Sequence, residues 1–225
     1  MIRTVTKGIR RVFKKGPVDT ARWAWYHFYE RAREHYLGIE TESCDDWQDS
    51  FADENYHVYQ PLCYSCIDTA LSRLDITPGE DAFLDYGSGK GRIVSVAATY
   101  PFKRVLGVEL LADLNDIARE NIRRAEKRLK CRDVEFIETD ATKYELPGDI
   151  TVLFLFNPFL NDVLKAVQHQ IRKSLDRYPR RVQIVYMNPL ENEDLFAECE
   201  WLRQREELPV GRWEAMRFRI YENRR

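Results

Sequence analysis

The chain has 225 residues, of which 44% are hydrophobic and 32% are charged, and its formal net charge is −2. This length accommodates one α/β domain with an extension and is short for two full domains. The near-neutral charge provides no overall attraction to nucleic acid, which is not an expected partner. No apolar run is long enough to span a bilayer, and the basic N-terminus lacks the apolar stretch of a secretory signal. We therefore expect a cytoplasmic protein.

Five cysteines, an odd number, are scattered along the sequence, which is not typical of a disulfide framework. Cys63 and Cys66 form a Cys-x-x-Cys pair, but neither a second pair nor histidines at ligand spacing follow to complete a zinc site. The pair lies in an expected helix rather than in a thioredoxin-like setting. We expect two partly buried thiols on adjacent turns, and no metal site.

Residues 1–80 are expected to form a helical extension, and the resemblance described below implies that it includes a segment covering a cofactor. In residues 1–15, apolar side chains recur at three- and four-residue steps among six Lys and Arg residues, a pattern typical of a basic amphipathic helix. Such a helix can contact a membrane surface or dock on its own domain, and both alternatives stay open. Residues 21–36 are dense in aromatic side chains, which usually pack, and are expected to cover the main domain.

Strand and helix patterns alternate from residue 82 onward. Strands are expected at residues 82–86, 104–109, 134–138, 150–156 and 182–187, followed by a hairpin of 201–208 and 213–221. Helices are expected at residues 62–74, 90–100, 111–129, 160–177 and 191–198. The alternation predicts an α/β fold with a doubly wound, mostly parallel, seven-stranded sheet and a C-terminal antiparallel hairpin. Residues 81–225 would form this domain, with ligands beyond the carboxyl ends of its strands.

A glycine-rich turn follows the first strand of this domain. The sequence there reads Asp85-Tyr86-Gly87-Ser88-Gly89-Lys90-Gly91-Arg92. The glycines let the backbone approach a ligand, and free amides at a helix start face it. Lys90 is not followed by the Ser or Thr of a P-loop, and Arg92 occupies the last glycine position of a dinucleotide fingerprint. Asp85 would repel a pyrophosphate but attract the ammonium group of an amino-acid-like ligand. Lys90 and Arg92 are expected in solvent.

Acidic residues end the next two strands. Glu109, followed by Leu110, ends the second strand, and its carboxylate can accept hydrogen bonds from two ribose hydroxyls. Asp140, followed by Ala141, comes after the third strand, where an adenine amino group could be held. Their joint placement after consecutive strands predicts a nucleoside site.

The fourth strand ends in Asn157-Pro158-Phe159. Pro158 has no amide hydrogen, Asn157 offers a donor and an acceptor, and Phe159 offers a ring wall. Such a set can orient an acceptor nitrogen beside a cationic methyl donor.

These four motifs resemble those of class I (seven-strand) S-adenosylmethionine-dependent methyltransferases over about residues 59–187. The detailed form is similar to a group of uncharacterised bacterial members, including the upstream Gly38-Ile39-Glu40-Thr41. The loop is also similar to that of Dot1-like and other seven-strand protein lysine methyltransferases. Asn-Pro-Phe replaces the (Asn/Asp)-Pro-Pro-(Tyr/Phe) of nucleic-acid amino methyltransferases, which argues against DNA adenine methylation.

The resemblance implies a Rossmann-like methyltransferase fold with S-adenosyl-L-methionine as cofactor. The cofactor-binding residues that it implies are Tyr59, Asp85, Tyr86, Gly87, Ser88, Gly89, Gly91, Glu109, Leu110, Asp140, Ala141 and Asn157. The residues expected at the transferring methyl are Tyr59, Asn157, Pro158 and Phe159. The methyl acceptor would be a nitrogen or oxygen of a protein lysine or a small metabolite. The alternative is a catalytically silent S-adenosylmethionine-binding protein, acting in regulation or as a scaffold at a membrane surface. The sequence indicates no particular oligomeric state.

Overall fold

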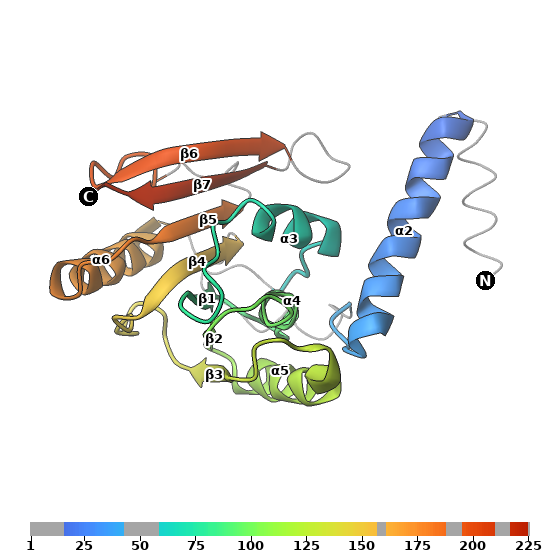
Figure 1. The fold of residues 1–225 in the computed structure, drawn as a ribbon, viewed down its shortest axis with the longest axis horizontal. Helices are drawn as coiled ribbons and strands as arrows, with labels where there is room; N and C mark the ends of the chain where they lie inside the picture. The colour runs from blue at the N-terminus through green and yellow to red at the C-terminus, as the bar shows by residue number, and fades with distance from the viewer. Residues whose placement is uncertain (1–15, 43–58, 157–160, 188–194, 210–216, 225) are drawn as a thin grey trace.

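The computed structural model describes residues 16–42, 59–156, 161–187, 195–209 and 217–224. Its centre is a seven-stranded sheet in the order β3-β2-β1-β4-β5-β7-β6 (Figure 1). The strands are β1 (Ala82–Tyr86), β2 (Arg104–Glu109), β3 (Val134–Glu138), β4 (Ile150–Phe156), β5 (Gln183–Met187), β6 (Leu202–Pro209) and β7 (Arg217–Asn223). The doubly wound, mostly parallel sheet that the sequence predicts is confirmed.

The first five strands run parallel, because β1 pairs with β2 and β4, β2 with β3, and β4 with β5. All five residues of β1 and all five of β5 are buried, which explains why both strands are apolar apart from Asp85 and Gln183. Strand β7 is antiparallel to both of its neighbours, β5 and β6, and forms the expected hairpin with β6. The carboxyl ends of β1, β2 and β3 therefore meet at one edge of the sheet.

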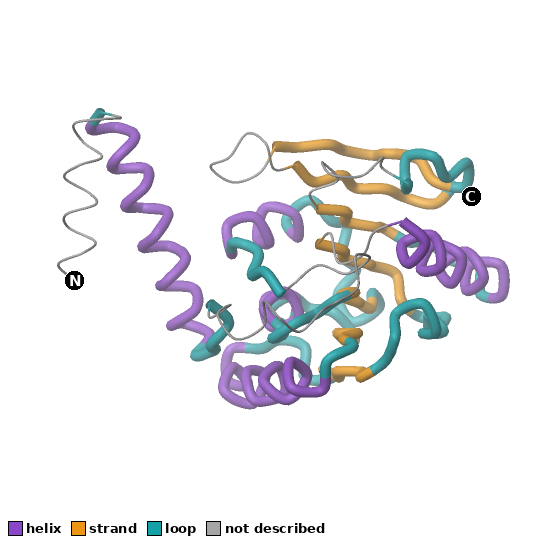
Figure 2. The backbone as a smooth tube through the Cα atoms, turned by 180° about the vertical axis from the view of Figure 1, so that it is seen from behind, coloured by secondary structure: helices purple, strands orange, loops and turns teal. Residues whose placement is uncertain are grey.

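Helices cover both faces of the sheet, and the sheet separates two hydrophobic cores (Figure 2). One face carries α3 (Tyr64–Leu71), α4 (Arg92–Ala97) and α5 (Ala112–Ala125), the last continued by the 3-10 helix η1 (Glu126–Arg128). The other face carries α6 (Asn161–Arg177), whose apolar side packs against inward residues of β1, β4 and β5. This arrangement buries the apolar faces of the helices against the sheet.

Helix α2 (Pro17–Leu37) precedes the sheet and differs most from expectation. It begins at a proline and ends at Gly38, whose left-handed conformation allows its amide to bond back to Glu34 and His35 carbonyls. Its C-terminal half lies against the domain, whereas its N-terminal half projects away (Figure 1). Trp25 is 66% exposed and Phe28 is 64% exposed, so the expectation that the aromatics cover the main domain is wrong for these two, whereas Tyr29 packs against the core. The side of α2 that meets the domain instead makes mainly ionic and hydrogen-bonded contacts.

The other differences lie at element ends. The helix expected to reach residue 129 ends at residue 125, and residues 126–128 tighten into the 3-10 turn. Of the short helix expected at 191–198, residues 195–198 form turns and the rest lies outside the described residues, as does the segment 1–15. Within the described part of the chain, no helix combines the length and the apolar character needed to cross a bilayer. The boundary between an extension and a domain at residues 80 and 81 stays a prediction.

Candidate active site

The glycine-rich turn crosses over the end of the neighbouring strand β2. The amides of Gly87 and Ser88 both donate to the Val108 carbonyl, at 2.8 and 3.1 Å. Helix α4 begins directly after Gly91. These bonds hold the turn, which links β1 to α4, at the carboxyl edge of the sheet.

Asp85 lies beneath this turn, and its side chain is fully buried. Neither carboxylate oxygen has a hydrogen-bond partner among the residues that the structure describes. Burial, and secondly the nearby Glu109, raise the pKa of Asp85 well above its usual value. A buried carboxylate without a donor is costly unless a cation or a proton neutralises it. The position therefore suits the ammonium group of a ligand that carries an α-amino acid.

Glu109, at the end of β2, binds the turn from below. One oxygen of its carboxylate accepts a hydrogen bond from the Gly89 amide at 2.9 Å. The other oxygen accepts from the amides of Leu110 and Leu111, at 2.8 and 3.0 Å, just before α5 begins. Because an ionised carboxylate has about four acceptor positions, one position remains for a ligand hydroxyl. Burial raises the pKa of Glu109, while the three amides lower it. Glu109 thus joins the turn to α5, a role that the sequence analysis did not anticipate.

The third predicted acid lies at the same edge. Asp140 follows β3, whose end is held beside β2 by the Thr139 amide donating to the Glu109 carbonyl at 3.0 Å. One Asp140 oxygen accepts bonds from the amide and hydroxyl of Thr142, which hold its pKa below the usual value despite partial burial. Ala141 is buried at 3% exposure, whereas Leu110 is 40% exposed. Leu110 therefore offers an open apolar surface between the second and third strand ends.

The ring of Tyr59 covers the glycine-rich turn. A Cβ atom built on Gly89 would lie 2.5 Å from Cε2 of Tyr59, so the ring rests directly on the glycine backbone. The Tyr59 hydroxyl donates to the Thr41 carbonyl at 2.7 Å, and the Lys90 ammonium lies 5.3 Å from the ring centroid. The structure thus brings Tyr59 to the glycine turn, as the sequence predicts for a residue that covers a cofactor.

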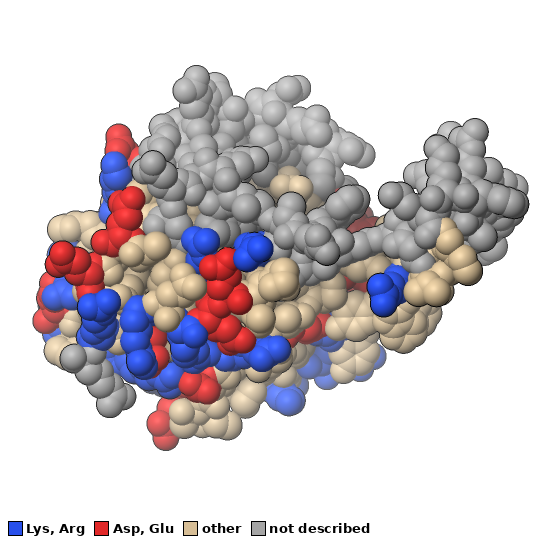
Figure 3. All heavy atoms as spheres, turned by 90° about the horizontal axis from the view of Figure 1, so that it is seen from above, with Lys and Arg blue, Asp and Glu red and all other residues tan. Residues whose placement is uncertain are grey.

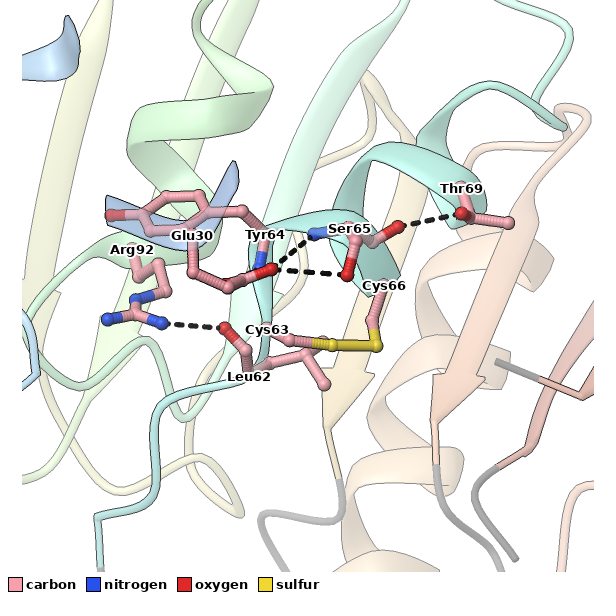
Figure 4. The surroundings of a disulfide bond; sticks show 8 residues. All are labelled: Glu30, Leu62, Cys63, Tyr64, Ser65, Cys66, Thr69 and Arg92. Carbon is pink, nitrogen blue, oxygen red and sulfur yellow. Dashed lines mark hydrogen bonds between the residues drawn. A yellow bond between two sulfur atoms is a disulfide. The ribbon is translucent and has the colours of Figure 1, made fainter. Parts of the chain in front are cut away.

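Arg92 is buried rather than solvated, which corrects the expectation for it and for Lys90; their exposed fractions are 7% and 4%. Its guanidinium donates to the Thr41 hydroxyl at 2.6 Å, the Leu62 carbonyl at 3.0 Å and the Glu34 carboxylate at 3.0 Å. The guanidinium also lies over the Tyr64 ring, 4.5 Å from its centroid (Figure 4). The charge is tolerated because each direction of the guanidinium meets an acceptor or a ring. Arg92 therefore connects α4 to α2 and to both ends of the segment that carries Tyr59.

Asn121 makes a second connection that the sequence analysis missed. It is 1% exposed, and its side-chain nitrogen donates to the carbonyls of Lys90 and Glu40 at 2.9 and 3.2 Å. Its side-chain oxygen accepts from the Glu40 amide at 2.9 Å. A polar residue on the apolar face of the predicted helix, seven positions after Leu114, was the available signal.

Cys63 and Cys66 form a disulfide, so the expectation of two thiols is wrong (Figure 4). Cys63 is the N-cap residue of α3, and Cys66 lies in its first turn. This places their Cα atoms 5.2 Å apart, within the range that a disulfide spans. The bond lies one residue from Leu62 and therefore borders the Arg92 contacts.

The side chain of Tyr86 lies apart from the residues above. The Tyr86 ring is fully buried in the core beside α6, edge-on to Tyr144, and burial raises the pKa of its hydroxyl. The trio Asn157, Pro158 and Phe159 lies outside the described residues. The predicted residues that meet at one edge are therefore Asp85, the turn from Gly87 to Gly91, Glu109 with Leu110, Asp140 with Ala141, and Tyr59.

Comparison with known families gives the site its context. A model of the family described as "Histone methylation protein DOT1" matches residues 41–200, which include every strand-end motif discussed above. The chain belongs to the DOT1 family. This DOT1-family protein is a methyltransferase that uses S-adenosylmethionine. No curated protein sequence matches the chain significantly.

Solved structures place the DOT1-family chain in the class I methyltransferase fold. An RNA methyltransferase from Salinibacter ruber, solved with S-adenosyl-L-homocysteine, aligns with a TM-score of 0.54 and 23% identity over 73% of this chain and 94% of its own. An S-adenosylmethionine-dependent methyltransferase from Aquifex aeolicus aligns with a TM-score of 0.53 and 16% identity, over 69% and 88% of the two chains. A ribosomal protein L11 methylase from Lactobacillus delbrueckii aligns with a TM-score of 0.50 and 17% identity, over 71% and 77%.

Proposed function

We propose that the chain binds S-adenosylmethionine at the carboxyl edge of β1, β2 and β3 and methylates the side-chain nitrogen of a protein lysine. The observation that carries the cofactor assignment is the fully buried Asp85 carboxylate, which has no donor among the described residues and lies under a glycine turn. The name of the matching family, which refers to histone methylation, supports a protein acceptor.

Each strand end would hold a different part of the cofactor. Asp85 and the backbone of the turn face the methionine part, because a carboxylate attracts its ammonium group and free amides donate hydrogen bonds to its carboxylate. Glu109 accepts a bond from a ribose hydroxyl with its remaining acceptor position. Asp140 and Ala141 border the adenine, with Leu110 against its ring face. Tyr59 covers the methionine part from above the turn.

The bound cofactor supplies a methyl carbon that its sulfonium makes electrophilic. The protein has to align the acceptor with that carbon and exclude water, since the leaving group is already good. The ring of Tyr59, which lies against the backbone of Gly89, excludes water from that side of the turn. The acceptor amine attacks in its neutral form, so an apolar approach that lowers its pKa favours the reaction. Asn157, Pro158 and Phe159 are the predicted neighbours of the methyl group and remain a sequence-based expectation.

The test is transfer of radiolabelled methyl from S-adenosylmethionine to a cell lysate, followed by separation into protein, nucleic acid and small molecules. We expect label in lysine of the protein fraction with the wild type and none with Asp85→Ala. Label that appears only in small molecules or in nucleic acid would overturn the protein acceptor.

The second candidate is a silent cofactor-binding protein, and the same experiment separates the two. If calorimetry detects binding of S-adenosylmethionine but no fraction contains labelled product, the silent binding protein is favoured. Absence of binding in the wild type, or equal affinity of the wild type and the Glu109→Ala variant, would contradict the site itself.

A further inference from the structure

We propose that the outward face of α2 is a docking surface for an anionic lipid bilayer, which places this methyltransferase at a membrane surface without crossing it. The proposal rests on α2 and not on the residues that hold the cofactor.

An apolar stripe runs along the side of α2 that faces away from the domain. Val18, Trp25, Phe28 and Tyr36 are 66%, 66%, 64% and 52% exposed. Their spacing of seven, three and eight residues keeps them on one helix face, because seven residues make about two turns. Trp25 and Phe28 touch each other, with ring centroids 5.8 Å apart. Large exposed aromatics grouped in this way mark an interaction site rather than ordinary surface.

Two of the three acidic side chains of α2, those of Glu30 and Glu34, lie on the side of the helix that meets the domain. Glu30 is 8% exposed and accepts bonds from the amides of Tyr64 and Ser65. Glu34 is 9% exposed and binds Arg92. The stripe therefore faces outward without either of these carboxylates beside it.

Positive charge flanks the stripe. Arg22 and Arg31 are exposed on α2, and the Arg128 guanidinium lies 5.0 Å from the Tyr36 ring at the end of the helix. The projecting part of the molecule is mainly tan with blue in the space-filling view of Figure 3. The sequence before α2 adds six Lys and Arg residues and no acid within residues 1–15. Apolar aromatics bordered by cations fit the interface of an anionic bilayer.

The position of the stripe allows contact with a flat surface. The N-terminal half of α2 stands apart from the sheet, so β6 and α6 do not lie against it (Figures 1 and 2). Trp and Tyr rings prefer the headgroup region of bilayers, whereas a contact between protein chains carries no such requirement for flanking cations. A bilayer is therefore the occupant that the combination favours.

Flotation with vesicles tests the proposal on the full chain. We expect the wild type to float with phosphatidylcholine vesicles that contain phosphatidylserine. With vesicles of phosphatidylcholine alone, it should remain in the unfloated fraction. The double substitution Trp25→Ala and Phe28→Ala should lower the partition coefficient at least about tenfold, because two buried aromatic contacts are lost. The matched control is Tyr178→Ala, which removes a 44% exposed aromatic next to α6 and should float like the wild type.

Three outcomes would overturn the proposal. Equal flotation of the double variant and the wild type would remove α2 as the docking surface. A wild-type dimer in light scattering that the double variant loses, without flotation of either, would make a second copy the occupant. A lowered melting temperature of the double variant with unchanged flotation would mean that the stripe packs within the chain. Methyl transfer in solution should be the same in the double variant and the wild type, which separates this test from the proposed activity.

Discussion

The ring of Tyr59 occupies the space that any side chain at position 89 would need. A Cβ atom on Gly89 would approach Cε2 of Tyr59 to 2.5 Å, and the backbone there has a φ of +52°. Position 89 requires glycine for two reasons: its backbone has a positive φ, and the Tyr59 ring leaves no space for a Cβ atom. The cofactor turn and the segment that covers it are therefore fitted to each other.

Gly89→Ala should weaken binding of S-adenosylmethionine at least about tenfold and destabilise the fold by about 1–3 kcal/mol. The matched control is Gly79→Ala, which has a φ of +73° but no atom within 4 Å of the added Cβ. It should show the backbone strain alone and leave cofactor affinity unchanged. Calorimetry and urea unfolding measure both quantities, and equal affinity losses in the two variants would contradict the contact with Tyr59.

Cofactor affinity should rise with pH through the raised pKa of Asp85. In the free protein, burial and Glu109 hold the Asp85 proton to a higher pH than in the unfolded chain, so the folded state binds more protons. The stability contribution of Asp85 is therefore greatest at low pH and falls as pH rises toward its folded pKa. An ammonium ligand requires the ionised carboxylate, so binding releases a proton.

The Asp85→Asn variant tests this linkage. It should weaken cofactor binding, remove the pH dependence and leave the melting temperature of the free protein unchanged or higher at neutral pH. Calorimetry in buffers of different ionisation enthalpy measures the released proton. A wild-type affinity that does not vary with pH would count against Asp85 as the ammonium partner.

The buried pair of Arg92 and Glu34 should contribute strongly to stability. Glu34→Gln leaves the Arg92 charge without its carboxylate and should cost about 3–5 kcal/mol. Glu120→Gln, which breaks the exposed pair with Arg124, should cost less than about 1 kcal/mol. Urea unfolding measures both.

The affinity for the cofactor should also depend on Arg92. Because Arg92 holds Thr41 and Leu62, its loss in Arg92→Gln should loosen the segment with Tyr59 and lower cofactor affinity. A stability loss in this variant with unchanged affinity would limit Arg92 to a structural role.

The disulfide between Cys63 and Cys66 should add little stability because it closes a very short loop. Replacement of both cysteines by Ser should cost about 2 kcal/mol or less. Thermal melting with and without reductant measures this, and the wild type should lose a similar amount when reduced. The native, unreduced protein should show no reactivity at these two thiols; labelling of both would contradict the bond.

The sheet could be predicted from the sequence because burial on both faces turns each central strand into an apolar run. The same property identifies β4 and β5 without any reference to their neighbours. The orientation of α2 could not be predicted, since Trp25 and Phe28 are exposed while Tyr29 and two buried carboxylates contact the domain. Aromatic content indicates packing but does not say on which side of a helix the partner lies.

Some features of the candidate site could likewise be predicted from the sequence, and others could not. The positions of Asp85, Glu109 and Asp140 follow from their places after consecutive parallel strands. The burial of Arg92 depends on Glu34, which lies 58 residues earlier, and the clamp made by Glu109 depends on the amide of Gly89, 20 residues away. Contacts across such distances along the chain arise only from the folded arrangement. Local patterns therefore locate the strand ends but not the network that joins them to α2.

The order β5-β7-β6 has a consequence for how the protein is made. Strand β7 is translated after β6 yet lies between it and β5. Until β7 is in place, β5 has an open edge and β6 has no partner with which to pair. Open strand edges attract other chains, so newly made copies are exposed to aggregation until β7 inserts between its two neighbours.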